Sequence, residues 1–367
     1  MVLVHLRKLP ILRSKSSERR AQDGARFTWR MMLMLSVPAM ALALTGSPDV
    51  KIAPGVMMPL VAAGTWQYND STAENAVAAA IGAGFTHIDT AADYKNQRGV
   101  SKGLARSGVG REAIFVTTKV PGCGFQGVRP GHCEEDTLAA IRADIAQLSG
   151  SFMALKQLDL VLLHFPPCTS APAGLPSPVA SSCNKDRTGC SGDNLAAVRA
   201  QWHALEAAKA ANLTRAIGVS NFCAACLDAV IAGGKTPPAV NQVQFHVGMG
   251  ANPQHFLSAA KSRGVVLQAW SPLGHGGHGS SDIMHGPLTT GIGAAHNKSA
   301  VQVALKWIVS KGVAVVTKSG NPVHLREDLD LFDFSFTPSE VADLDAATFA
   351  RQDTPSFMCD DAVETVA

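Results

Sequence analysis

Four side chains near the ends of short apolar segments have the types needed for one reaction. Asp89 and Tyr94 lie five residues apart in the segment GFTHIDTAADYKN. Later apolar segments supply Lys119 in IFVTTKV and His164 in LDLVLLHFP. Together these residue types predict the reduction of a carbonyl group.

The chemistry of carbonyl reduction explains why these residues belong together. Hydride delivered to the carbonyl carbon leaves charge on the oxygen, so a positioned proton donor lowers the barrier. Tyrosine can be that donor if a buried ammonium pulls its pKa below about 10, and a carboxylate keeps the ammonium charged. A neutral imidazole can orient the carbonyl. We therefore expect Tyr94 to be the acid and His164 the orienting group. Lys119 and Asp89 would lower the tyrosine pKa.

The order of the motifs resembles the aldo-keto reductase family over residues 51–367. GFTHIDTAADY resembles its first signature, TTKV its lysine strand and LDLVLLHFP its histidine strand. The segments IGVSNF, VNQVQFH, AWSPLG and VVTKSGNPVHLRE follow in the family's order. This resemblance implies a single-domain (β/α)8 TIM barrel of the α/β class. It also implies an NADP-type nicotinamide cofactor without a Rossmann domain, and the reduction of aldehydes or ketones.

Composition and periodicity independently allow a barrel. With 46% hydrophobic and 17% charged residues, the chain of 367 residues can bury one large core. Short apolar segments alternate with amphipathic ones such as TLAAIRADIAQL, which is typical of repeated βα units in a parallel sheet. The eight predicted strands are 60–64, 86–89, 114–120, 158–165, 216–220, 240–246, 265–270 and 314–317.

In such barrels the reactive side chains lie where the carboxyl ends of the strands meet. Asp89, Tyr94, Lys119 and His164 all satisfy that placement. Taken singly, each also fits a structural role, because a barrel core can contain an ion pair and a hydrogen-bonded histidine. Their joint occurrence in the family's order favours the catalytic interpretation.

The resemblance also implies a cofactor site. Ser220, Asn221 and Gln242 match residues that hold the nicotinamide amide. Trp270 stands where the family often has a tyrosine, and we expect it to stack on the nicotinamide ring. The other matched positions are Gly64, Thr65, Ser271 and Leu273, with Lys318 and Ser319 at the 2′-phosphate.

The segment expected to bind the adenine end departs from the family. His324 replaces an arginine that commonly forks onto the 2′-phosphate, although Arg326 can substitute. Glu327 and Asp328 occupy positions where uncharged amides often contact adenine. We therefore expect NADPH to be used, with a weakened preference over NADH. Gln97 is a further departure, because glutamate usually follows the YxN motif.

Substrate identity is less evident from the sequence. Trp66 and Phe165 resemble aromatic wall positions of the family's pocket, which suit medium-sized aldehydes, ketones or ketoses. Residues 166–194 form an insertion rich in Pro, Ser, Ala and Cys, which is not expected to have regular structure.

Cysteines gather around the predicted mouth of the barrel. They predict loop disulfides, with free thiols or a metal site as alternatives. The CAAC motif, Cys223 to Cys226, allows a redox pair but more simply indicates ordinary helix packing. No metal is expected at the Gly-rich segment GHGGHGSSDIMHG, which is interpreted as a loop that folds over the cofactor. The five loop cysteines are Cys123, Cys133, Cys168, Cys183 and Cys190.

Residues 1–45 are interpreted as a signal or targeting segment. Basic residues precede the apolar segment MMLMLSVPAMALAL, which has about the length of a signal-peptide core and is short for a membrane span. Ala41 and Ala43 resemble a cleavage site. This predicts a secretory or organelle location. An uncleaved anchor, a disordered extension and a cytoplasmic protein are the alternatives.

Charge excludes one class of partner. The net charge of +3 includes eight Lys/Arg and two Asp/Glu in residues 1–43, which leaves about −3 for the remainder. Nucleic acid is therefore not an expected partner. We expect a monomeric NADP(H)-dependent enzyme that acts on a small carbonyl compound. The alternatives are a cofactor-binding regulatory protein, similar to relatives associated with membrane channels, and a structural protein on the same fold.

Overall fold

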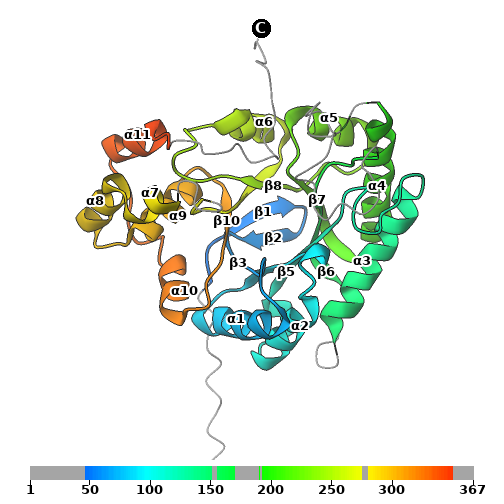
Figure 1. Ribbon diagram of the computed structural model, residues 1–367, viewed down its shortest axis with the longest axis horizontal. Helices are drawn as coiled ribbons and strands as arrows, with labels where there is room; N and C mark the ends of the chain where they lie inside the picture. The colour runs from blue at the N-terminus through cyan, green and yellow to red at the C-terminus, as the bar shows by residue number, and fades with distance from the viewer. Residues whose placement is uncertain (1–45, 151–154, 170–189, 191, 275–279, 350–367) are drawn as a thin grey trace, which may run out of the picture. The chain divides into compact units, whose positions relative to one another are not determined.

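A closed barrel forms the centre of the computed structural model, which describes residues 46–150, 155–169, 190, 192–274 and 280–349. Within these residues, parallel strands close in the order β10-β3-β4-β5-β6-β7-β8-β9, with helices around them (Figure 1). The predicted (β/α)8 barrel is confirmed. Its strands are β3 (Val61–Gly64), β4 (His87–Asp89), β5 (Phe115–Val120), β6 (Leu158–Leu163), β7 (Thr214–Ser220), β8 (Val240–Gln244), β9 (Val266–Trp270) and β10 (Ala314–Thr317).

Two strands end earlier than the sequence predicts. Strand β6 ends at Leu163 and β8 at Gln244, so His164 and Phe165 follow their strand instead of lying in it. Pro166 has no N–H and fixes its own backbone, which stops the strand ladder at this point. The backbone N–H of His164 still donates to the carbonyl of Val120, at 2.8 Å. This bond holds His164 at the end of the barrel wall.

An antiparallel hairpin that the sequence analysis missed covers the amino-terminal end of the barrel. It consists of β1 (Asp49–Ala53) and β2 (Val56–Pro59). Buried Ile52, Val56 and Met58 pack against side chains from the barrel strands, including Leu160 and Val240. In Figure 1 the hairpin lies over the centre of the barrel. The loops that follow the carboxyl ends of the strands therefore frame the opposite, open end.

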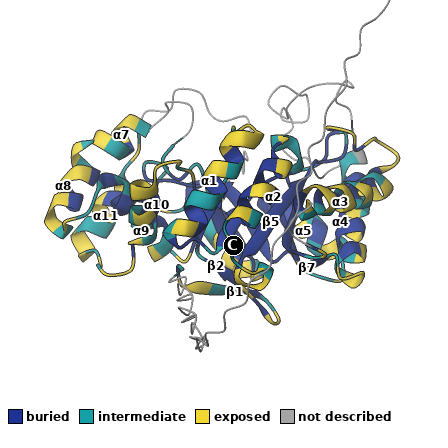
Figure 2. Ribbon diagram, turned by 90° about the horizontal axis from the view of Figure 1, so that it is seen from below, coloured by how far each residue is buried: buried dark blue, intermediate teal, exposed yellow. Residues whose placement is uncertain are grey.

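The helices cover the outside of the barrel, and Figure 2 shows that most of the barrel strands are buried while the outer faces of the helices are exposed. The large fully buried side chains include Trp202 and Trp307. The helices are α1 (Asp70–Ala83), α2 (Gln97–Arg106), α3 (Cys133–Ser149), α4 (Asp193–Ala210), α5 (Ala224–Gly233), α6 (Phe256–Arg263), α7 (Ser280–His285), α8 (Pro287–His296), α9 (Ala300–Ser310), α10 (Pro322–Leu329) and α11 (Pro338–Ala346), with short 3-10 helices η1 (Ala92–Tyr94), η2 (Arg111–Ala113) and η5 (Pro253–His255).

Close packing of α2 on α1 fixes the loop that carries Tyr94. A Cβ atom at Gly99 would lie 2.0 Å from the backbone oxygen of Asp70, so only glycine allows this approach. The N–H of Gly99 also donates to the Asp70 carboxylate at 3.0 Å. Since η1 directly precedes α2, this contact anchors the loop on its carboxyl-terminal side.

Disulfides connect the loops around the open end. Cys123 pairs with Cys133, which confirms the prediction of loop disulfides. Cys190, however, pairs with Cys226 at the start of α5. Cys223 is disulfide-bonded as well, so the interpretation of the CAAC motif as ordinary packing was wrong for both cysteines. No cysteine within the described residues is free, and Cys183 lies outside them.

Several sequence predictions fall on residues that the structure does not describe. They include the targeting segment 1–45, most of the insertion 166–194, and five residues of the Gly-rich loop. None of the helices in the described ranges has the length and apolar character needed to cross a membrane. Over the same ranges, no three His, Cys, Asp or Glu side chains gather as a metal site.

Candidate active site

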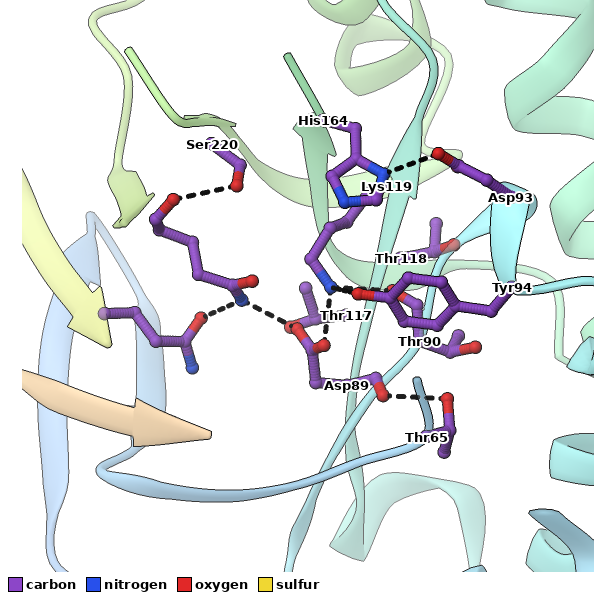
Figure 3. Close-up of polar contacts among 12 residues, drawn as sticks. Thr65, Asp89, Thr90, Asp93, Tyr94, Thr117, Thr118, Lys119, His164 and Ser220 are labelled. Atoms are coloured by element: carbon purple, nitrogen blue, oxygen red, sulfur yellow. Dashed lines mark hydrogen bonds and ion pairs between the residues drawn. The ribbon is translucent and has the colours of Figure 1, made fainter. Parts of the chain in front are cut away.

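The four predicted catalytic residues meet at the open end of the barrel (Figure 3). Asp89 is the last residue of β4, Tyr94 ends η1, and Lys119 lies near the end of β5. Nζ of Lys119 is 2.5 Å from Oδ1 of Asp89 and 3.2 Å from the hydroxyl of Tyr94. Its third bond, of 3.0 Å, goes to the backbone oxygen of Thr90.

The hydrogen bond from Lys119 to Tyr94 determines the direction in which the tyrosine hydroxyl can donate its proton. An ammonium group has three donors and no acceptor. The Tyr94 oxygen must therefore accept from Lys119, and its own proton is left for another acceptor. A substrate carbonyl oxygen is such an acceptor. The contact between Lys119 and Tyr94 thus orients a proton donor toward the open end.

The pKa of Tyr94 differs from the expectation. Burial raises it to about 12, and the positive charge of Lys119 opposes this rise only in part. The prediction of a pKa below the usual value was wrong, because sequence alone did not weigh desolvation against the ammonium. Burial also tends to lower the pKa of Lys119, but Asp89 and Tyr94 outweigh it and the net direction is upward. Near neutral pH the lysine is charged and the tyrosine is protonated, which is the form that can donate.

His164 completes the group and has a partner that the sequence analysis missed. Its Nδ1 lies 3.1 Å from Oδ2 of Asp93, with both side chains largely buried. Its ring stacks on Phe165, with centroids 4.4 Å apart, and meets the ring of Tyr94 edge-on at 5.8 Å. The only sequence signal for Asp93 was a carboxylate directly before Tyr94.

Three residues matched to the nicotinamide amide are joined in one network with Trp270. Ser220 donates to the backbone oxygen of Gln242 at 2.8 Å. The amide of Asn221 donates to the backbone oxygen of His164 and accepts from the indole N–H of Trp270, each at 2.9 Å. Asn221 has a φ of 63°, a conformation uncommon for residues other than glycine that recurs at functional sites.

Gln242 connects this network to the catalytic carboxylate. Its Nε2 donates to Oδ2 of Asp89 at 2.8 Å and to Oε1 of Gln268 at 2.8 Å. Asp89 therefore accepts from both Lys119 and Gln242. Gln268, fully buried on β9, was not predicted as a site residue.

The remaining matched positions near the open end have mainly backbone roles. Gly64 is the register partner of Asp89, and both the N–H and the hydroxyl of Thr65 donate to the backbone oxygen of Asp89 at 3.1 Å. Ser271 follows β9 with a φ of 47°. Leu273 packs on the edge of the core.

Lys318 approaches the predicted substrate wall. Its Nζ donates to the backbone oxygen of Trp66 at 3.2 Å and to the side chain of Gln67 at 3.0 Å. It also lies over the ring of Tyr68, 5.2 Å from the centroid. Burial lowers the pKa of Lys318. The hydroxyl of Ser319 accepts from the backbone N–H of Asn321, which caps α10.

The residues of α10 that were predicted to bind the adenine end of the cofactor differ in their exposure to solvent. His324 and Arg326 are exposed, and Glu327 is partly buried. Asp328 is buried, accepts from the hydroxyl of Thr317 at 2.8 Å, and has its pKa raised to about 6 by burial. Asp328 is therefore buried against β10 and bonded to Thr317, so we do not retain it as an adenine contact.

The departure at Gln97 has a structural reason. The Gln97 amide donates to the hydroxyl of Thr118 at 2.9 Å, and that hydroxyl donates to Asp144 at 2.8 Å. Burial raises the pKa of Asp144 to about 7. A glutamate at position 97 would put a second carboxylate into this buried contact, whereas the amide supplies a donor.

We expect Asp144→Asn to remove a pH dependence of stability. The folded protein keeps the Asp144 proton up to about pH 7, whereas the unfolded chain loses it above about pH 4. Stability is therefore lost as pH rises through this window, by at most about 1.4 kcal/mol per pH unit. Urea unfolding at pH 5, 6, 7 and 8 should show a flatter profile for the variant. Asp49→Asn is the exposed control, and parallel wild-type and Asp144→Asn profiles would contradict the assignment.

Comparison with known proteins gives the same family at the level of sequence. The model of the aldo/keto reductase family matches residues 57–348. A glyoxal reductase from Bacillus subtilis is 34% identical over 298 residues, which covers 81% of this chain and 91% of the relative. A morphine 6-dehydrogenase from Pseudomonas putida is 32% identical over 307 residues, which covers 82% of this chain and 90% of the relative.

Solved structures of the same family superpose on this barrel. An aldo/keto reductase from Brucella melitensis superposes with a TM-score of 0.65 at 29% identity, covering 82% of this chain and 98% of the other. An aldo-keto reductase from Bombyx mori in complex with NADP superposes with a TM-score of 0.67 at 27% sequence identity. The match covers 82% of this chain and 92% of the other. The barrel, the four residues at its open end and these similarities lead to one conclusion: the chain belongs to the aldo/keto reductase family.

Proposed function

We propose that this protein reduces aldehydes or ketones to alcohols with NADPH, and that Tyr94 donates the proton. The observation that carries the proposal is the bond from Lys119 to the Tyr94 oxygen, which leaves the tyrosine proton free beside His164. A reduced nicotinamide, when bound, supplies hydride to the carbonyl carbon. Asp89 keeps the buried lysine charged, and Gln242 holds the second oxygen of Asp89.

The residues at the open end fit a nicotinamide cofactor. Ser220 at the end of β7 is the register partner of Gln242 on β8, and Asn221 directly follows Ser220, so one hydroxyl and two amides lie on neighbouring strands. Gln244 is the register partner of Trp270, and its buried Oε1 has no hydrogen-bond partner among the described residues. A buried acceptor without a donor is costly, and a carboxamide N–H is a suitable donor. In our proposal these residues hold the nicotinamide amide, and Trp270 stacks on its ring.

The case for NADPH rests on the charge near α10. Lys318 and Ser319 precede the N-terminus of α10, where the helix dipole favours an anion such as a 2′-phosphate. The similar Bombyx mori structure is described in complex with NADP. The exposed His324 contributes less to phosphate binding than an arginine fork would.

We expect His324→Arg to raise the preference for NADPH over NADH by about tenfold, the effect of one charge-assisted bond worth about 1.5 kcal/mol. The measurement is the ratio of the two dissociation constants, from quenching of tryptophan fluorescence. His324→Gln serves as the neutral control. An unchanged ratio in His324→Arg would mean that Arg326 already binds the phosphate, and Arg326→Gln should then lower the ratio.

The substrate pocket is proposed to have an aromatic wall and one polar side. Phe165 stacks on His164, and Trp66 is 40% exposed near Lys318. Such a pocket suits medium-sized carbonyl compounds. Two similar chains are named for compounds of very different size, a glyoxal reductase and a morphine 6-dehydrogenase.

Oxidation of NADPH by the full chain against a panel of aldehydes and ketones tests the proposed function, with NADH in parallel and Tyr94→Phe as the inactive control. Turnover that disappears in the variant would support it. Tight NADPH binding without turnover would overturn it in favour of a regulatory cofactor-binding protein.

We also propose that the protein works in an oxidising compartment. The support is the pair of disulfides, Cys123–Cys133 and Cys190–Cys226, because such bonds persist mainly outside reducing cytosol. Thiol labelling of protein isolated from its native cells without reductant tests this. Complete labelling of these four cysteines before reduction would contradict it.

A further inference from the structure

We propose that Gln268 is a positioning residue that fixes the side-chain amide of Gln242, so that Gln242 presents only its Oε1 to the carboxamide of the nicotinamide. This inference rests on the proposed function, because it concerns the cofactor end of the same site. It deepens that function by assigning a residue that neither the sequence motifs nor the comparisons single out.

The first support is the placement of the two glutamines. Gln242 on β8 and Gln268 on β9 are register partners, and their exposed fractions are only 2% and 0%. Side chains of residues paired on neighbouring strands project from the same face of the sheet. Here that face also carries Asp89. Nε2 of Gln242 donates to Oε1 of Gln268 and to Oδ2 of Asp89, each at 2.8 Å.

The partners of Gln242 determine the orientation of its amide. Asp89 forms an ion pair with Lys119, and a carboxylate only accepts hydrogen bonds. The Gln242 atom that faces Asp89 is therefore the nitrogen, and its second hydrogen goes to Gln268. Both donors of the Gln242 side chain are then used within the protein. Its Oε1 is the only group of the amide left for a ligand.

The second support is the cost of placing an amide at position 268. Nε2 of Gln268 is buried and has no hydrogen-bond partner among the described residues. A buried donor without an acceptor is unfavourable, and an apolar side chain of the same size would fill this space without that cost. Packing alone therefore does not explain a glutamine here. Its acceptor oxygen does, because an apolar side chain could not hold the Gln242 amide.

The consequence is a site that recognises the amino group of the carboxamide. A carboxamide has N–H donors and a carbonyl acceptor, and the Gln242 Oε1 can bind only the donors. The donors of Ser220 and Asn221 are also bonded within the protein. Oε1 of Gln244 is a further buried acceptor that lacks a partner among the described residues. These side chains therefore offer acceptors to the cofactor.

The test compares the full-length wild type with Gln268→Met in binding NADP+ and its 3-acetylpyridine analogue, in which a methyl group replaces the carboxamide NH2. Methionine keeps the size of glutamine and removes the acceptor, so the Gln242 amide can turn its freed N–H toward the cofactor. We expect Kd for NADP+ to rise about five- to tenfold, as for loss of one hydrogen bond, and Kd for the analogue to change by less than about twofold. Quenching of tryptophan fluorescence measures both constants.

Two further variants separate positioning from packing. Gln268→Glu keeps an acceptor at this place and should keep the ratio of the two constants close to that of the wild type. Gln126→Met makes the same change as the first variant at an exposed site and is the matched control. Equal weakening of both dinucleotides in Gln268→Met would overturn the proposal, since lost packing does not distinguish NH2 from methyl. A wild type that binds NADP+ but turns over no carbonyl compound would instead sink the proposed function, and the ratio would still decide the role of Gln268.

A measurement on the wild type keeps the proposal testable if the variants at position 268 fold poorly. NMR of isotope-labelled glutamine side chains follows the two amide hydrogens of Gln242, identified by their loss in Gln242→Asn. Both hydrogens should be protected from exchange with solvent, because each is bonded to a buried acceptor. Exchange of either hydrogen at the rate of an exposed amide would contradict the assignment.

Discussion

Replacing Tyr94 by phenylalanine is expected to lower kcat for carbonyl reduction by a factor of about 10² to 10⁴, the usual contribution of a positioned acid. The change removes one hydroxyl and keeps the ring that meets His164 edge-on. Because that hydroxyl accepts a bond from Lys119 and donates none to any described residue, only the proton donor and one lysine bond are lost. Steady-state oxidation of NADPH measures the effect.

Cofactor binding separates this expectation from general damage. Within the described residues, Tyr94 forms no hydrogen bond to Ser220, Asn221 or Gln242, so Kd for NADPH should remain close to that of the wild type. A matching loss of NADPH affinity would show that the variant disturbs the site as a whole. Retained turnover would transfer the role of acid to another group, with His164 the first candidate.

Periodicity and motif order were sufficient to predict the barrel. Each of the eight apolar segments became a barrel strand, because a strand buried on both faces of a parallel sheet must be continuously apolar. The catalytic group was predictable because Asp89, Lys119 and His164 each lie at or near the end of such a segment. Parallel strands bring those ends to the same edge.

What could not be predicted depends on burial and on contacts between distant segments. The pKa of Tyr94 results from desolvation against the charge of Lys119, and its sign requires the actual packing. Asp93 was passed over because a carboxylate in a loop usually faces solvent. The pairing of Cys190 with Cys226 links residues 36 positions apart, and cysteine spacing does not specify connectivity.

Removing the ammonium of Lys119 is expected to have the largest effect on stability. Lys119→Met leaves the Asp89 carboxylate buried and without its cation, which typically costs about 3–5 kcal/mol. Catalysis should also be lost, because the Tyr94 oxygen no longer has its donor. The measurement is the free energy of unfolding in urea near neutral pH.

A double-mutant cycle separates the unpaired charge from lost packing. Asp89→Asn in the Lys119→Met background removes the stranded charge, so it should recover much of the lost stability, because replacing both members of a buried pair is far less costly than removing one. Arg106→Met is the surface control, since its exposed contact with Glu74 is worth at most about 1 kcal/mol. Additive losses in the Lys119–Asp89 cycle would mean that the two side chains do not depend on each other. The effect of each substitution would then come from lost packing and not from the ion pair. A group other than Lys119 would have to orient the Tyr94 proton.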